Sequence, residues 1–267
     1  MTRTGVLNAD EPDPVAIERP QGGSRILLVC EHASNRMPRS LGTLGMVADA
    51  LESHVAWDIG ALGVSLRLSE ILDATLIHQR YSRLVYDCNR PPEATDSIPE
   101  KSEVFHVPAN ANLTWDERRD RARVLYTPFQ EAIGAELDRR VAERREKPVL
   151  VTVHSYTGRY FGVDRDPATG ILHDEDSRLA DAMLNLASVR SGVAYRRNHP
   201  YGPEDGVTHT LRRQALPRGI PNVMIEICNA HIADEAGQGE WAERLANLLT
   251  AGIERLDHAA GGDRSVA

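Results

Sequence analysis

Three mostly apolar runs, each followed by an ionisable residue, constrain the fold of this chain more than any other feature. The runs are residues 26–30 before Glu31 and His32, residues 148–153 before His154, and residues 221–225 before Glu226. Apolar segments of this length, bounded by turn residues, are typical of strands that are buried on both faces of a sheet. Open α/β sheets bind their ligands at the carboxyl ends of such strands. The sequence therefore predicts that two imidazoles and a carboxylate project over one sheet edge.

The composition is that of a globular protein with an acidic surface. The chain has 267 residues, of which 41% are hydrophobic and 26% are charged, and its formal net charge is −8. This charge disfavours binding to nucleic acid or to anionic membranes. Three cysteines without a CxxC pair favour a reducing compartment. We expect a cytoplasmic protein, since no run reaches the ~18 apolar residues of a membrane span and the N-terminus lacks a signal-peptide core.

Helical and extended patterns alternate along the chain. Besides the three runs, we expect helical segments at 47–72, 114–141, 177–188, 207–216 and 241–256, and strands at 74–78 and 170–173. Thr114 and Glu117 form a capping-box sequence at the start of the long helix, which Pro128 should kink or interrupt. The alternation predicts a three-layer αβα fold with a largely parallel, mixed sheet. We expect a flexible arm at 1–23, a single α/β domain at 24–257 and a frayed C-terminus at 258–267.

The three strand ends have the chemistry of a catalytic metal site. Two histidines and a carboxylate, with an open fourth position, are the donors of catalytic zinc sites. His32 and His154 suit Zn²⁺, and they leave other first-row metals such as Fe, Co or Mn possible. A further carboxylate is needed as general base, because a water molecule has to lose a proton as it attacks. The candidate carboxylates are Asp58, Glu226, Glu31, Asp87 and Glu52.

Each candidate also has a purely structural interpretation. A histidine at the end of a strand is often only a hydrogen-bonded residue, and Asp58 could simply be favoured by the dipole of a helix start. Glu31 should point away from His32, because side chains alternate along a strand. Glu226 is the hardest to explain structurally, since burying an unpaired carboxylate is costly. The absence of GxSxG, P-loop and GxGxxG motifs argues against a serine nucleophile and against nucleotide binding.

Five short motifs in chain order resemble the N-formylglutamate amidohydrolase family. They are Cys-Glu-His32-Ala-Ser-Asn35, Trp-Asp58-Ile-Gly60, Tyr-Ser-Arg83-Leu followed by Asp87-Cys-Asn89-Arg90-Pro, Val-His154-Ser155-Tyr-Thr, and Ile-Glu226-Ile. The resemblance extends from about residue 25 to residue 232. It implies a phosphorylase/hydrolase-like fold, similar to that of zinc-dependent exopeptidases and zinc N-acetylmuramoyl-alanine amidases.

The resemblance also implies roles for individual residues. It implies that His32, Asp58 and His154 bind one zinc ion and that Glu226 is the general base. A ligand pair of the exopeptidase type would need a glutamate where this chain has Asn35, so Asp58 is preferred. The implied reaction is hydrolysis of the N-formyl or another N-acyl amide of an acidic amino acid. The substrate contacts expected on this basis are Arg83, Asn89, Arg90, Ser155 and Asn35, with Arg196 or Arg197 in addition.

One position departs from the family pattern. After the strand-end Glu226, where a basic residue is expected, the chain has Cys228 and Asn229. One anchor for a substrate carboxylate is therefore missing or has moved, which leaves the exact acyl substrate open. Two alternatives remain: a peptidase or muramoyl-amidase-like hydrolase acting at the same site, and a non-catalytic binding protein on the hydrolase fold.

Overall fold

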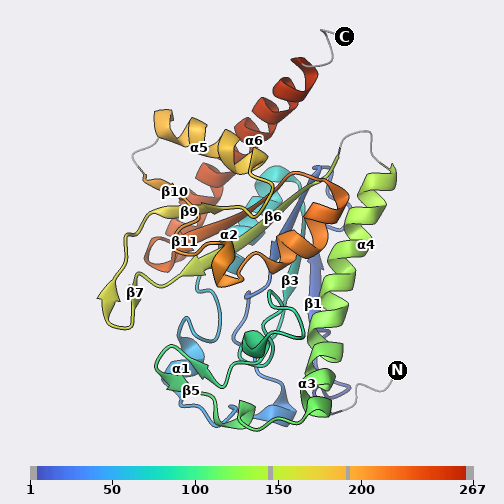
Figure 1. Ribbon diagram of the computed structural model, residues 1–267, viewed down its shortest axis with the longest axis vertical. Helices are drawn as coiled ribbons and strands as arrows, with labels where there is room; N and C mark the ends of the chain where they lie inside the picture. Colours follow the sequence, from blue (N-terminus) through green and yellow to red (C-terminus); the bar gives the residue numbers. More distant parts are fainter. Residues whose placement is uncertain (1–4, 144–146, 191–192, 263–267) are drawn as a thin grey trace.

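The computed structural model describes residues 5–143, 147–190 and 193–262 of the chain. Its centre is a seven-stranded sheet with the strand order β1-β3-β2-β6-β11-β9-β10 (Figure 1). The strands are β1 (Val15–Glu18), β2 (Ile26–Cys30), β3 (Thr75–Gln79), β6 (Val149–Tyr156), β9 (Thr169–Leu172), β10 (Tyr195–Arg197) and β11 (Asn222–Cys228). β1 is antiparallel to β3 and β9 is antiparallel to β11, whereas the other neighbours are parallel. The prediction of a largely parallel mixed sheet is confirmed.

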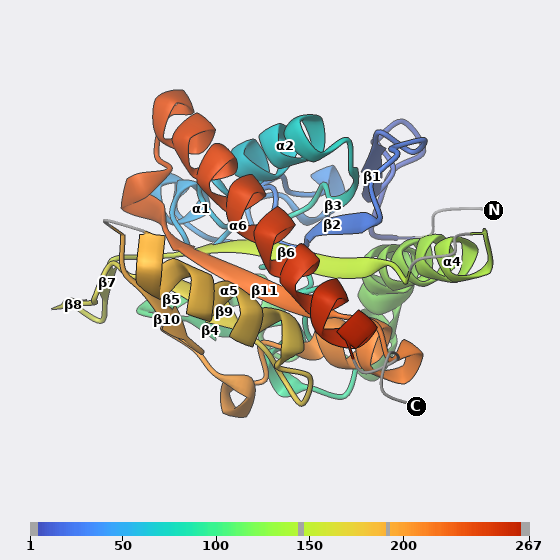
Figure 2. The ribbon, with the colours of Figure 1, turned by 90° about the horizontal axis from the view of Figure 1, so that it is seen from above.

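Helices cover both faces of this sheet, as the three-layer prediction requires. The helices are α1 (Ala48–Glu52), α2 (Ala61–Leu72), α3 (Trp115–Arg121), α4 (Thr127–Glu143), α5 (Arg178–Arg190) and α6 (Glu235–Gly262). α2, α5 and α6 pack on one face, and Figure 2 shows α6 running between the other two. α4 packs on the opposite face, beside β1 and β3. None of the helices in the described ranges combines the length and apolar composition that crossing a bilayer demands.

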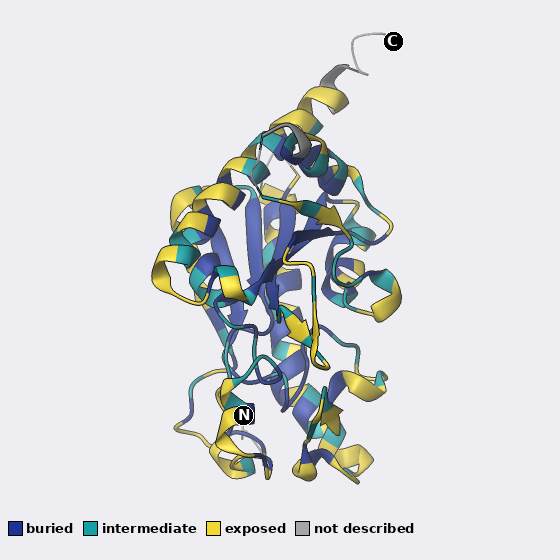
Figure 3. Ribbon diagram, turned by 90° about the vertical axis from the view of Figure 1, so that its left-hand side faces the viewer, coloured by how far each residue is buried: buried dark blue, intermediate teal, exposed yellow. Residues whose placement is uncertain are grey.

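The central strands are buried along their whole length (Figure 3). Adjacent residues of β2 enter different cores: Leu27 packs in the cluster that contains Phe129 of α4, and Leu28 in the cluster that contains Leu245 of α6. Burying each such side chain stabilises the fold by roughly 1.5–3 kcal/mol. Within the central strands, the buried ionisable residues of the predicted site, His154 and Glu226, lie toward the carboxyl ends of β6 and β11.

The N-terminal segment is part of the domain instead of the flexible arm that the sequence predicts. β1 pairs with β3 and forms one edge of the sheet, and Val6 and Leu7 are buried in the core on the α4 side. β1 has only four residues, and its place in the sheet depends on the pairing with β3, which follows much later in the chain. At the other end α6 continues to Gly262, beyond the predicted fraying point. Residues 1–4 and 263–267 lie outside the described ranges.

The predicted long helix is present and interrupted. Thr114 caps α3 in the capping box expected with Glu117. A π-helical segment at Ala122–Tyr126 separates α3 from α4, just before Pro128. Pro128 has no N–H to donate to the carbonyl of Val124, so the regular hydrogen-bond ladder cannot continue there.

Short elements complete the chain. Two small hairpins are formed by β4 (Lys101–Ser102) with β5 (Phe105–His106) and by β7 (Arg159–Tyr160) with β8 (Val163–Asp164). Single-turn 3₁₀ helices lie at Arg39–Leu41, Thr95–Ser97, Pro108–Asn110, Pro203–Asp205, Leu216–Arg218 and Asn229–His231, with a second π-helical segment at Leu211–Ala215. The β7–β8 hairpin projects from the body of the molecule (Figure 2).

Candidate active site

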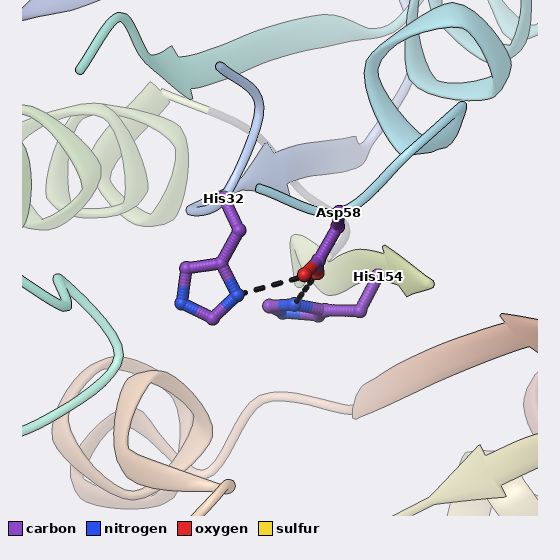
Figure 4. Close-up of side chains that lie close together, drawn as sticks. All are labelled: His32, Asp58 and His154. Carbon is purple, nitrogen blue, oxygen red and sulfur yellow. Dashed lines mark hydrogen bonds and ion pairs between the residues drawn. The ribbon is translucent and has the colours of Figure 1, made fainter. Parts of the chain in front are cut away.

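His32, Asp58 and His154 come together although they belong to three separate elements (Figure 4). His32 follows β2, Asp58 precedes α2, and His154 lies in β6. The Nδ1 atoms of His154 and His32 lie 2.8 Å and 3.2 Å from the same oxygen, Oδ2 of Asp58. One donor atom from each residue lies within 4.8 Å of the other two. The two histidines thus meet at the sheet edge as predicted, with Asp58 between them.

The turn that carries Asp58 depends on a glycine. The expected helix over 47–72 is divided into α1 and α2, and Asp58 lies in the gap, where its backbone N–H donates to the carbonyl of His32 at 2.9 Å. Gly60 then adopts a φ of 81°, and a Cβ at this position would come 2.1 Å from the carbonyl oxygen of Ile232. Only glycine accommodates both the dihedral angle and the close approach. The turn fixes the aspartate against the end of β2.

A carboxylate also lies behind each histidine. Nε2 of His32 lies 2.7 Å from Oδ1 of Asp87, and Nε2 of His154 lies 3.1 Å from Oε2 of Glu31. In metal sites, a carboxylate that receives the outer N–H of a histidine fixes the orientation of the ring and leaves the other nitrogen for the metal. In both rings the other nitrogen is Nδ1, and both Nδ1 atoms are within hydrogen-bond distance of Oδ2 of Asp58.

The electrostatics of this group favour positive charge between the carboxylates. Burial would raise the pKa of Asp58, but His32 and His154 outweigh burial and hold this pKa far below its usual range. Burial would lower the pKa of His154, but Glu31 and Asp58 raise it well above its usual value. Burial lowers the pKa of His32 too, yet Asp87 and Asp58 raise it overall. A divalent cation can replace the protons of both imidazoles, so His32, Asp58 and His154 fit such an ion.

Glu226 is a buried carboxyl group beside this cluster. It lies on β11 opposite His154 of the neighbouring β6, and its side chain is only 4% exposed. Among the described residues, its Oε2 atom has no hydrogen-bond partner. Burial, reinforced by the charge of Asp58, raises the pKa of Glu226 to about 7. A carboxyl group with a pKa near neutrality can both accept and return a proton under physiological conditions.

A cavity of about 230 Å³ opens onto these groups. Its wall contains the cluster and Glu226, together with most of the polar residues that the sequence indicated. The lining residues are His32, His54, Asp58, Arg83, Asn89, Arg90, His154, Ser155, Tyr156, Thr157, Tyr160, Tyr201, Asp205, Val207, Met224 and Glu226. The lining of the cavity is therefore mostly polar, and it includes several tyrosine side chains.

Arg83 is placed where it can reach both the cluster and a ligand. Its guanidinium donates to Asp87 at 2.8 Å and to Asp58 at 3.4 Å, and the side chain is 30% exposed. Ser155 also lines the cavity, but its hydroxyl donates to the carbonyl of Ile59 at 2.8 Å, which ties β6 to the Asp58 turn. The partly exposed guanidinium of Arg83 can thus reach a ligand, whereas the hydroxyl of Ser155 already donates its proton to the protein.

Asn89 and Arg90 line the cavity but hold a neighbouring loop. The amide of Asn89 donates to the carbonyl of Val207 and accepts from the backbone N–H of Thr210. The guanidinium of Arg90 donates to Asp96 at 2.7 Å and to backbone carbonyls of the loop, including that of residue 206 at 2.8 Å. Their polar atoms are engaged in these bonds, so both residues shape the wall of the cavity.

Two predicted substrate contacts lie elsewhere. Asn35 donates to the carbonyl of Leu51 at 3.0 Å and is not part of the cavity wall. Arg196 lies on the edge strand β10, where it pairs with Asp166 at 2.6 Å, again outside the cavity. Neither position supports a contact with a ligand in this cavity. Asn35 belongs to the first motif and Arg196 to none of the five, and the structure places the side chains of both outside the cavity wall.

Part of the cavity wall has no local signal in the sequence. Tyr160 belongs to the short strand β7, Tyr201 and His54 belong to loops, and the position of these segments relative to the sheet depends on tertiary packing. The expectation that Glu31 points away from the site is not met: β2 ends at Cys30, so alternation does not extend to Glu31, and its Oε2 lies 3.1 Å from Nε2 of His154 on the neighbouring strand. Glu52, by contrast, is exposed on α1. The three cysteines are buried and unpaired, and burial raises the pKa of the Cys30 and Cys88 thiols.

Comparisons with known proteins identify the family of this chain. The family model for N-formylglutamate amidohydrolase matches residues 24–233. A crystal structure of a gene product from Agrobacterium tumefaciens is 49% identical, with a TM-score of 0.92, and the match covers 94% of this chain and 99% of that one. An N-formylglutamate amidohydrolase from Ralstonia eutropha JMP134 has the same fold at 14% identity, with a TM-score of 0.63 and coverages of 94% and 100%. A search of curated sequences finds no significant match. The chain belongs to the N-formylglutamate amidohydrolase family.

Proposed function

We propose that this protein is a zinc-dependent amidohydrolase that removes the formyl or another acyl group from the nitrogen of an acidic amino acid. The observation that carries the proposal is the position of Glu226, a buried carboxyl group whose Oε2 has no hydrogen-bond partner among the described residues, beside the His32–Asp58–His154 cluster. Family membership supports hydrolysis of a linear amide. The metal, the substrate and the role of Glu226 are parts of this proposal.

The histidine–aspartate cluster would hold the metal. Two imidazoles and one carboxylate favour Zn²⁺, and other first-row ions remain candidates. When bound, such an ion supplies Lewis acidity, which polarises an amide carbonyl and acidifies water. Asp87 and Glu31 would keep the two imidazoles in the orientation that this role requires.

Glu226 would move the proton. As the base form, it accepts a proton from the water that attacks the acyl carbon; as the acid form, it returns that proton to the departing amine nitrogen. Its raised pKa of about 7 suits both halves of this transfer. Arg83 would offer N–H groups to a carboxylate of the substrate, since guanidinium groups bind carboxylates with charge-assisted hydrogen bonds.

The size of the cavity favours a small substrate over a larger peptide. Its volume of about 230 Å³ is below the roughly 300–1,000 Å³ of pockets that enclose drug-sized ligands. A muramoyl-amidase-like or peptidase activity at the same site is the alternative, and a binding protein without activity is the second. The cytoplasmic location also stays a prediction.

A substrate panel tests this proposal. The purified full chain, loaded with Zn²⁺, is assayed for amine release from N-formylglutamate, N-acetylglutamate, N-formylleucine and a muramoyl peptide, before and after chelation. We expect turnover of the acidic acyl amino acids that chelation abolishes and added metal restores. Cleavage of the muramoyl peptide alone would favour the alternative hydrolase. If the metal-loaded protein turns over none of the compounds, the proposal that it is an amidohydrolase is refuted.

A further inference from the structure

The arginines that line the cavity are already engaged by the protein. Arg90 donates to Asp96 and to backbone carbonyls, and Arg83 lies between the carboxylates of Asp58 and Asp87. The cavity wall also contains the carboxyl group of Glu226. An anionic substrate therefore needs positive potential beyond what these two arginines leave available.

Arg165 supplies a positive charge directly behind the aromatic wall. Its guanidinium carbon lies 4.1 Å from the ring centroid of Tyr160 and 5.0 Å from that of Tyr201, both of which line the cavity. Its Nη1 donates to the hydroxyl of Tyr201 at 2.8 Å. Within the described ranges, no carboxylate forms an ion pair with Arg165. Arg83 and Arg90, the arginines among the lining residues, both have such a partner, whereas the charge of Arg165 lies beside the two tyrosines.

The direction of the hydrogen bond determines what Tyr201 can do. A guanidinium group can only donate, so the phenolic oxygen of Tyr201 accepts from Arg165 and keeps its own proton for another partner. Burial, and after it the charge of Glu226, raises the pKa of Tyr201, so the hydroxyl stays protonated. Tyr201, a lining residue of the cavity, therefore has an O–H donor that is backed by a positive charge and is not used in its bond to Arg165.

The hairpin that carries Tyr160 is held at the mouth of the cavity by a second contact. The backbone N–H of Phe161 donates to Oε1 of Glu103 at 2.7 Å, and Oε2 of Glu103 lies 3.0 Å from Nε2 of His54 on the cavity wall. Glu103 thus connects the residue after Tyr160 to His54 on the cavity wall. This connection holds the stacked side chains of Tyr160 and Arg165 beside the cavity.

We infer that Tyr201 contacts a carboxylate of the substrate and that Arg165 is the positioning residue that orients its hydroxyl and provides the matching charge. The inference rests on the proposed function, because it names the part of the same cavity that would recognise the acidic substrate. It accounts for a carboxylate anchor in a chain that has Cys228, a buried thiol outside the cavity, where a basic residue is expected.

Ligands that differ by one charge test this inference. The probes are N-formylglutamate and its two monoamides, in which either the α-carboxylate or the side-chain carboxylate is replaced by a neutral amide. The variants are Arg165→Met, which removes the charge; Tyr201→Phe, which keeps the ring stack; and Arg165→Lys, which restores charge. Arg159→Met is the matched control, because Arg159 lies on the same hairpin with its side chain 70% exposed to solvent.

We expect Arg165→Met and Tyr201→Phe to raise KM for N-formylglutamate by roughly 10- to 100-fold, the usual effect of losing a hydrogen bond to a charged group, with kcat within about threefold. One of the two monoamides should be nearly insensitive to both variants, and Arg165→Lys should recover part of the loss. An equal change for all three probes, or no change, would overturn the inference, even if both variants fold normally.

Calorimetric binding of the same probes separates this inference from the proposed function. If the metal-loaded wild type hydrolyses none of them, the proposed function fails, yet the difference in Kd between the acid and its monoamides still measures carboxylate recognition. A preference for the acid that Arg165→Met abolishes and Arg159→Met leaves intact supports the inference. Equal Kd values for acid and monoamides in the wild type refute it.

Discussion

The Nδ1 atom of His154 lies 2.8 Å from Oδ2 of Asp58, although 96 positions separate the two residues in the chain. The fold brings the two residues together, because β6 lies directly beside β2 and the Asp58 turn is hydrogen-bonded to the residue His32 that follows β2. Ser155 strengthens the connection, since its hydroxyl donates to the carbonyl of Ile59 in the same turn. The geometry of the cluster thus depends on strand register and on one tight turn.

Replacing Asp58 by asparagine should weaken metal binding by at least about 100-fold, because loss of a ligand exceeds the 10- to 100-fold effect typical of its supporting residues. Metal titration by calorimetry measures the change. Asp49→Asn, an exposed aspartate on α1, is the control and should bind as the wild type does. Wild-type affinity in Asp58→Asn would exclude this residue as a ligand.

Glu31→Gln should weaken metal binding by roughly 10- to 100-fold, because the carboxylate behind His154 would lose its charge. The folded structure should persist, since the amide has nearly the same shape. Metal affinity and thermal unfolding, measured on the same samples, check both expectations. An affinity equal to that of the wild type would mean that the contact with His154 has no part in metal binding.

Metal affinity should increase as the pH rises through the neutral range. The pKa values of His32 and His154 are raised by their carboxylate neighbours, so protons compete with the metal for the same nitrogens at and below neutral pH. Binding should therefore release protons, and calorimetry in buffers of different ionisation enthalpy counts them. An affinity that stays constant between pH 6 and pH 8 would contradict this assignment of the ligands.

Gly60→Ala should destabilise the fold by about 1–3 kcal/mol or more and should also weaken metal binding. The substitution adds a side chain at a φ of 81° and forces its Cβ against the carbonyl of Ile232. Gly162→Ala is the matched control, since Gly162 has a φ of 78° but open space around its Cβ. Urea unfolding compares the two, and equal losses would show that the contact with Ile232 is unimportant.

The strand ends could be predicted because strands buried on both faces leave continuous apolar runs, and the residues after those runs meet at one edge. Asp58 needed the family resemblance, since its turn is defined by a distant contact of Gly60 with Ile232. Local patterns were least informative for loops. Arg90 and Arg196 were both expected to contact the substrate, yet tertiary packing places Arg90 on the cavity and Arg196 away from it.

The edge of the sheet and the aromatic wall were missed for similar reasons. β1 has only four residues, and its place at the edge of the sheet depends on pairing with β3, which follows much later in the chain. Tyr201 and Arg165 meet only because the loop after β10 returns toward the β7–β8 hairpin. Contacts of this kind have no signature in either segment alone.

The most direct test of the account is hydrolysis of N-formylglutamate by Glu226→Gln, with the metal content measured on the same samples. We predict that the variant holds as much metal as the wild type but that its kcat is lower by about 100-fold or more, the usual contribution of a general base. Glu52→Gln, which alters an exposed glutamate, should retain full activity. A metal-loaded Glu226→Gln that hydrolyses N-formylglutamate at the wild-type rate would contradict the account.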